Sequence, residues 1–242
     1  MKVLQPTRLM REAAEVLQPV RDEVVVIGAT ALEAALWGTG ARSAATTDVD
    51  CAVGMRSAAA VIDQLESAGL APSEEPHERG FTWVRYGIKV QLIRPPARVA
   101  NPPVSRLVPN PHLSLTDRYR EPVAFDDSPG EPRLLVARAA AILALKGQAF
   151  GRSRPSGGLV ERDYHDAYLL VAHVGDEIAA EYNGTDDGQL RGLVRKTLDD
   201  LLGEQGREAV RNQATRLESD LSPREADVRL RRAVAGLRGA LR

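Results

Sequence analysis

The sequence predicts an α+β protein: an N-terminal mixed sheet with flanking helices, followed by a C-terminal helical bundle. Short apolar stretches alternate with amphipathic ones as far as residue 94. Prolines then interrupt residues 95–132, and beyond them only helical periodicity is found. We therefore expect an α/β domain over residues 1–130 and a helical domain over residues 131–242.

The composition is that of a globular chain without extreme charge. Of 242 residues, 43% are hydrophobic and 27% are charged, and the formal net charge is −1. Any nucleic-acid binding must therefore come from local basic patches. The single cysteine, Cys51, excludes an internal disulfide and fits a reducing compartment. The start of the chain has no apolar signal core, and no apolar run is long enough to span a bilayer, so we expect a cytoplasmic protein with no membrane partner.

The elements of the first domain follow from apolar runs that end at glycine or proline. Residues 81–86 and 88–94 alternate apolar and polar side chains around Gly87, which predicts a hairpin. Residues 95–132 are expected to be a linker with one short strand pair near 113–125. The remaining elements expected here are a helix at 7–18, a strand at 23–28, a helix at 29–37, a strand at 48–53 and a helix at 57–69.

The second domain is expected to be entirely helical. Its first helix, RLLVARAAAILALKGQA at 133–149, is followed by the loop GRSRPSGG at 151–158. The helices expected after this loop cover residues 160–174, 187–202, 204–218 and 223–241.

The first candidate site combines a glycine turn with two carboxylates. Gly28 follows a buried strand and opens a helix, and free amides at a helix N-terminus favour a phosphate. Asp48 and Asp50 lie on the next expected strand, one residue apart, and therefore project from the same face. If the two strands are neighbours, the carboxylates lie beside the glycine turn, where they can hold one or two Mg²⁺ ions against a triphosphate. The alternatives are a plain strand–helix turn and a solvated pair of acids.

The second candidate site lies on the first two expected helices of the C-terminal domain. Lys146 falls on an apolar stripe, and a charge there requires an anionic partner unless the side chain reaches water at the helix end. Asp163 and Asp166 are three residues apart and share a helix face, and Arg162 is placed to pair with Asp166. Asp163 alternatively complements the helix dipole. His165 is expected to be exposed or to cap the helix.

These residues resemble the signature of the DNA polymerase β-like nucleotidyltransferase superfamily. The matching segments are GATA at 28–31, Arg42, and TDVD at 47–50. In that superfamily the two aspartates bind divalent metal ions and the glycine turn holds nucleotide phosphates. A third carboxylate often stands on a later strand, where this chain has Gln91, an amide that cannot act as a base.

The helical half is similar to that of the AbiEii-type and MenT-type toxin nucleotidyltransferases. There, a lysine and the motif Arg-Asp-x-x-Asp complete the Asp-x-Asp site; Lys146 and Arg162 to Asp166 match them. The resemblance implies NTP as substrate, Mg²⁺ or Mn²⁺ as cofactor, the 3′ end of tRNA as acceptor and a cognate antitoxin as partner. It gives catalytic roles to Asp48, Asp50, Lys146 and Asp163. The candidate nucleotide-binding residues are Gly28, Ala29, Thr30, Arg42, Thr47, Lys146 and Arg152.

Two other functions remain open. Aminoglycoside-type nucleotidyltransferases share the Asp-x-Asp site and act on a small molecule. A degenerate transferase fold without the third carboxylate would bind nucleotides without turnover. The C-terminal arginines, which alternate with acids from residue 204 onward, form either a solvated face or a surface that holds tRNA.

Overall fold

A computed structural model describes residues 1–41, 46, 48–96, 103–128, 130–150, 159–218 and 221–242. The chain divides into two compact units. We call Met1–Ala34 with Ala45–Arg138 the sheet unit, and Ala35–Ala44 with Ala139–Arg242 the helical unit.

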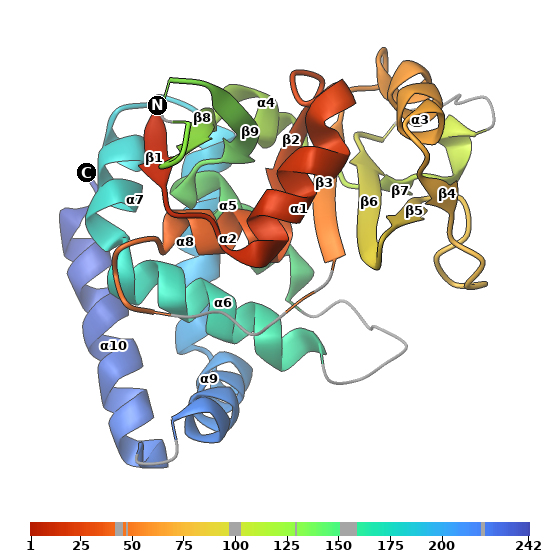
Figure 1. Cartoon of the computed structure of the whole chain (residues 1–242). Helices are drawn as coiled ribbons and strands as arrows, with labels where there is room; N and C mark the ends of the chain where they lie inside the picture. Colours follow the sequence, from red (N-terminus) through yellow and green to blue (C-terminus); the bar gives the residue numbers. More distant parts are fainter. Residues whose placement is uncertain (42–45, 47, 97–102, 129, 151–158, 219–220) are drawn as a thin grey trace. The chain divides into compact units, whose positions relative to one another are not determined.

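The described strands of the sheet unit form one mixed sheet (Figure 1). In chain order they are β1 (Lys2–Leu4), β2 (Val24–Ile27), β3 (Asp48–Val53), β4 (Ala71–Pro72), β5 (Thr82–Arg85), β6 (Ile88–Arg94), β7 (Val108–Pro109), β8 (Arg120–Phe125) and β9 (Pro132–Ala137). Their spatial order is β1-β8-β9-β2-β3-β6-β5-β4, and β7 pairs with β6. All four residues of β2 are buried, as expected for a central strand.

Helices flank this sheet. They are α1 (Arg8–Leu17), α2 (Gly28–Ala35), α3 (Ala58–Ser67) and α4 (Ser114–Arg118), with short 3₁₀ turns at Gln18–Val20 and Val104–Arg106. The Thr7 hydroxyl accepts a hydrogen bond from the Met10 amide and so caps α1. The buried residues of α1 include Met10, Ala13 and Leu17, and the helix contacts β6 and β9.

The helical unit consists of helices that pack against one another (Figure 1). They are α5 (Ala139–Ala149), α6 (Leu159–His173), α7 (Gly175–Asn183), α8 (Gly188–Leu202), α9 (Glu204–Leu217) and α10 (Pro223–Ala240). Seven residues of α5 are buried, so this helix forms the centre of the unit's core rather than an amphipathic surface helix. No described helix is both long and apolar enough to cross a lipid bilayer.

The predicted fold class is confirmed, but two predicted elements were wrong. The segment 132–137 is a strand rather than the start of a helix, and only 139–149 is helical. Leu134 and Val136 are buried while Arg133 and Leu135 are less so, a period of two that the surrounding apolar residues hide in the sequence.

The second correction concerns the segment expected to hold a strand pair near 113–125. It contains α4 followed by β8, and β8 pairs with β1 and β9 instead of with a neighbour in the linker. The strands β1, β4 and β7 and the helix α7 were not predicted at all. The sheet therefore continues through β9, and the contact boundary between the units falls after Arg138.

Candidate functional site

The two carboxylates of β3 lie where the sequence predicts. Asp48 and Asp50 are half-buried on one face, while Val49 and Cys51 point into the core. Strand β3 is antiparallel to β2 with Asp50 opposite Ile27, and it is parallel to β6 with Asp50 opposite Gln91. The N-terminal end of β3 therefore lies beside the end of β2, directly before Gly28.

Gly28 brings the start of α2 against the Asp50 carboxylate. Its φ is +65°, a conformation that costs other L-residues energy. A Cβ added at Gly28 would stand 2.1 Å from Asp50 Oδ2 and 3.0 Å from Asp50 Cγ. Only glycine allows both the turn and the close approach, so the glycine turn and the carboxylate pair form a single structural feature.

Replacing Gly28 with alanine is expected to destabilise the protein by more than the φ strain alone, which is about 1–2 kcal/mol, because the Asp50 carboxylate must also move. Gly69→Ala is the matched control, since Gly69 has a φ of +88° but no atom within 4 Å of an added Cβ. Urea unfolding of both variants measures the difference. Equal losses of unfolding free energy in the two variants would show that the contact with Asp50 adds nothing to the cost of the Gly28 substitution.

The groups around Gly28 suit a phosphate and a hard cation. The first amides of α2 have no partner within their own helix, and the helix dipole adds positive potential there. Thr30, on the first turn of α2, is fully buried, and its Oγ1 has no hydrogen-bond partner among the described residues. Carboxylate oxygens are the preferred ligands of Mg²⁺ and Mn²⁺, so Asp48 and Asp50 fit such an ion. No third His, Cys, Asp or Glu joins them in the described chain to make a larger cluster.

A lysine that the sequence did not single out as functional lies next to this pair. Lys89 stands opposite Asp48 in the register of β3 and β6, and its Nζ donates to Glu78 Oε1 at 2.6 Å. The hydrogen bond to Glu78 and the nearby Asp48 carboxylate raise the pKa of Lys89 against a smaller opposing effect of burial. The ammonium offsets part of the repulsion between the two aspartates. Lys89 could have been singled out from the sequence, because lysine is rare in this arginine-rich chain.

The second candidate site is a closed ion triad in the helical unit. Lys146 Nζ, on α5, lies 3.0 Å from Asp163 Oδ1 and 2.7 Å from Asp166 Oδ2, both on α6. The Asp166 side chain is fully buried, and Arg162 Nε lies 4.0 Å from its Oδ2, which confirms the predicted pairing. Gly147 keeps α5 close to α8, because an added Cβ would stand 1.8 Å from Thr197 Oγ1. The anionic partners that a buried lysine requires are therefore both aspartates of the motif.

Alkaline pH is expected to destabilise the helical unit through Lys146. Burial alone would lower the pKa of Lys146, but Asp166 and Asp163 outweigh it and raise that pKa. The folded state therefore keeps a proton that the unfolded chain releases. The stabilisation is complete below the ordinary lysine pKa of about 10.4 and is lost as the pH rises through the folded-state value.

Urea unfolding between pH 8 and 11.5 measures this effect. Burial also raises the pKa of Tyr164 and Tyr168, which act in the same direction. The comparison is therefore with Lys146→Met/Asp163→Asn/Asp166→Asn, which keeps both tyrosines and lacks the triad. The same alkaline loss of stability in both proteins would contradict the assignment to Lys146.

The prediction for His165 was wrong, since its side chain is buried with 3% of its surface exposed. Burial lowers the pKa of His165, while Asp166 and Glu218 raise it to a smaller extent. Helix α6 is buried on more than one face, because Tyr164 and Tyr168 are buried as well as Asp163 and Asp166. Arg42, Thr47 and Arg152 lie outside the described residues.

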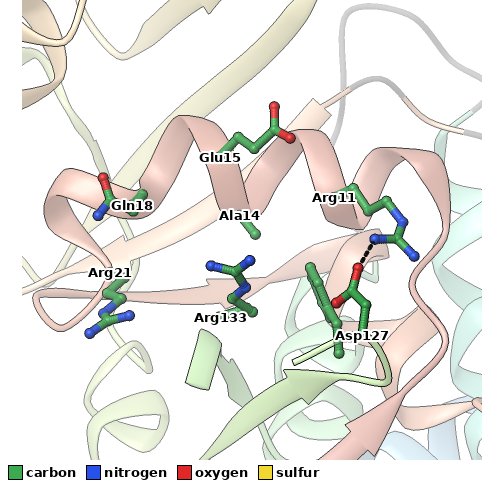
Figure 2. A pocket seen from close by; sticks show the side chains of 8 residues that line it. Arg11, Ala14, Glu15, Gln18, Arg21, Asp127 and Arg133 are labelled. Carbon is green, nitrogen blue, oxygen red and sulfur yellow. Dashed lines mark hydrogen bonds and ion pairs between the residues drawn. The ribbon is translucent and has the colours of Figure 1, made fainter. Parts of the chain in front are cut away.

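The sheet unit also contains a pocket of about 270 Å³ (Figure 2). It is lined by Arg11, Ala14, Glu15, Gln18, Arg21, Phe125, Asp127 and Arg133. Figure 2 shows Arg11 paired with Asp127 across one end of it. Arg21 and Arg133 both approach Glu131, at 3.4 Å and 3.9 Å. The pocket's arginines are thus largely balanced by carboxylates of the same unit.

The predicted site residues that the structure describes are divided between the two units. The sheet unit brings together Gly28, Ala29, Thr30, Asp48 and Asp50, and the helical unit brings together Lys146 and Asp163. Comparison of the chain with protein-family models, with curated proteins and with solved structures found no match.

Proposed function

We propose that this protein is a metal-dependent nucleotidyltransferase that moves an NMP from an NTP to an acceptor hydroxyl and releases pyrophosphate. The observation that carries the proposal is the contact between Gly28 and Asp50. It joins a paired-carboxylate strand to the N-terminus of α2, which is the combination that a metal–triphosphate complex requires.

In this proposal the sheet unit binds the nucleotide. Asp48 and Asp50 would hold Mg²⁺ or Mn²⁺, and the amides that open α2 would donate to phosphate oxygens. The ion would supply charge neutralisation at the triphosphate. Thr30 is a candidate from the sequence resemblance only, since its side chain is fully buried. Arg42, Thr47 and Arg152 remain candidate phosphate ligands from the sequence resemblance.

In the proposed reaction the acceptor hydroxyl oxygen attacks the α-phosphorus while the bond to the pyrophosphate oxygen breaks. From the sequence resemblance, Lys146 remains the candidate cation for a phosphate oxygen, and Asp163 remains the candidate acid that orients or deprotonates the acceptor hydroxyl. Within the helical unit, Asp163 and Asp166 accept two of the three N–H donors of the Lys146 ammonium.

The proposed acceptor is the 3′ end of tRNA, and the proposed biological role is the toxin of a toxin–antitoxin pair. Incubation with each of the four α-labelled NTPs, Mg²⁺ and total tRNA tests the reaction directly, and labelled tRNA is the expected product. A parallel incubation with an aminoglycoside tests transfer to a small molecule. Absence of labelled product in every combination would count against the proposal.

One observation favours a second candidate, a nucleotide-binding module without turnover. Gln91 stands opposite Asp50, at the place where a third carboxylate is expected. Calorimetry separates the two functions: the module predicts NTP binding that requires Mg²⁺ and disappears in Asp48→Ala, with no product formed by the parent protein.

A further inference from the structure

The arginines of α9 and α10 fall into two groups. Half of them are paired with carboxylates. The paired ones are Arg216 with Glu161, Arg229 with Glu218 and Glu225, Arg231 with Asp227, and Arg238 with Asp199. Arg207, Arg211, Arg224 and Arg232, in contrast, have no ion pair with any described residue.

The first three of these, Arg207, Arg211 and Arg224, line one pocket. It has a volume of about 410 Å³ and is bounded by Glu204, Arg207, Arg211, Pro223, Arg224 and Asp227. Arg207 and Arg211 are one helical turn apart on α9, and Arg224 belongs to the first turn of α10, which packs against α9. We call this feature the α9–α10 arginine pocket.

The pocket contains an unsatisfied donor. Arg207 Nε is buried and has no hydrogen-bond partner among the described residues. Leaving a buried charged donor without a partner costs free energy, as does the mutual repulsion of three guanidinium groups. Of the two acids at the pocket, Asp227 already accepts from Arg231 at 2.8 Å. Among the described lining residues, three arginines therefore stand against two carboxylates, which leaves an excess of positive charge.

We propose that the α9–α10 arginine pocket binds a backbone phosphate of an RNA chain. Guanidinium groups bind phosphate oxygens through paired N–H donors. None of the described residues that line the pocket has an aromatic or large apolar side chain, so none of them would hold the base of a free mononucleotide. A phosphodiester of a longer chain needs no such contact. The choice of RNA as the polyanion rests on the proposed function.

The test measures RNA affinity without turnover. Fluorescence anisotropy with a 5′-labelled tRNA transcript, in EDTA and without NTP, removes any contribution from the metal site. Arg211→Gln/Arg224→Gln is expected to weaken binding about tenfold at low salt and to reduce the slope of log K against log salt by about 1–2. Arg207 is left intact because part of it is buried.

Two controls make the result specific. Arg229→Gln/Arg238→Gln removes the same net charge from two paired arginines outside the pocket and is expected to change affinity much less. Glu204→Gln, which removes a carboxylate from the pocket, is expected to tighten binding, an effect that misfolding cannot produce.

An equal loss in both arginine variants, or unchanged affinity in Arg211→Gln/Arg224→Gln, would overturn the inference. Inhibition of RNA binding by AMP at the concentration at which unlabelled RNA competes would overturn the assignment to a polynucleotide. Because the anisotropy measurement contains no NTP, its result does not depend on nucleotidyl transfer. A negative result here would leave the proposed function standing, and a negative transfer assay would leave the RNA affinities interpretable.

Discussion

Replacing Lys146 with methionine is expected to destabilise the protein by about 3–5 kcal/mol. The substitution keeps the length of the side chain but leaves Asp163 and Asp166 in a buried environment without their shared ammonium. Their side chains are 7% and 0% exposed, so water cannot replace the lost hydrogen bonds. Asp166 Oδ1 has no hydrogen-bond partner among the described residues, so the bond that its Oδ2 accepts from Lys146 is the one that the substitution removes. Urea unfolding followed by circular dichroism measures the change.

Two variants show whether this cost comes from the buried triad. Lys196→Met removes an exposed lysine that pairs with Asp200 on α8, and it is expected to cost less than about 1 kcal/mol. The triple variant Lys146→Met/Asp163→Asn/Asp166→Asn removes the charges together and is expected to recover much of the stability. A Lys146→Met protein as stable as the parent would mean that the two carboxylates do not depend on the lysine.

The Asp50→Asn variant is expected to lose nucleotidyl transfer by at least about 10²–10³-fold in kcat, the loss seen when one preorganised charge-stabilising group is removed. Asparagine has nearly the same shape, so the contact with Gly28 is kept while the negative charge is removed. Measurement of kcat and KM with the active NTP, beside a thermal unfolding curve, separates loss of chemistry from loss of fold. This expectation rests on the proposed function.

Asp63→Asn provides the matched control for this second result. Asp63 is an exposed aspartate of α3 in the same unit, so its replacement makes the same chemical change away from the carboxylate pair. Parent-like turnover is expected of it. If Asp50→Asn kept the parent's kcat, the carboxylate pair would not be the catalytic centre and the metal-dependent mechanism would have to be abandoned.

The two candidate sites differ in how their charged side chains are neutralised by neighbouring residues. Asp48 and Asp50 are half-buried, and Lys89 stands opposite Asp48 on the neighbouring strand. Lys146 is instead already neutralised by carboxylates from a neighbouring helix. The triad is thus neutralised within the helical core, whereas the proposed function requires an added cation at the carboxylate pair.

Local sequence patterns predicted much of the fold because their signals are short-range. The period-two placement of Asp48 and Asp50 was enough to put them on one face of a strand, and the observed bounds of β3 agree with the prediction. The predicted bounds of the helices after residue 159 likewise lie within about two residues of the observed bounds, which is the usual precision of such bounds. The exception, α7, follows α6 with only Val174 as its N-cap and carries no capping side chain.

The segment 132–137 shows why other elements could not be predicted. Its residues are compatible with a helix, and β9 exists because β8 and β2 offer hydrogen-bonding edges on both sides. The register of a strand in a sheet depends on partners far away in the chain, which no local pattern contains. The predicted helix at 133–149 places Leu135 and Lys146 in one element for the same reason, whereas Leu135 belongs to β9 and Lys146 to α5.

By itself, the sequence determined which residue types can do chemistry and which of them share a strand or helix face. Spacing alone settles this, because backbone periodicity is local. Only the tertiary structure decided that Asp50 rests against Gly28, that Lys89 stands opposite Asp48, and that both aspartates of α6 close on Lys146. These contacts depend on the packing of segments that are distant in sequence. Burial then determines how strongly the charged groups interact.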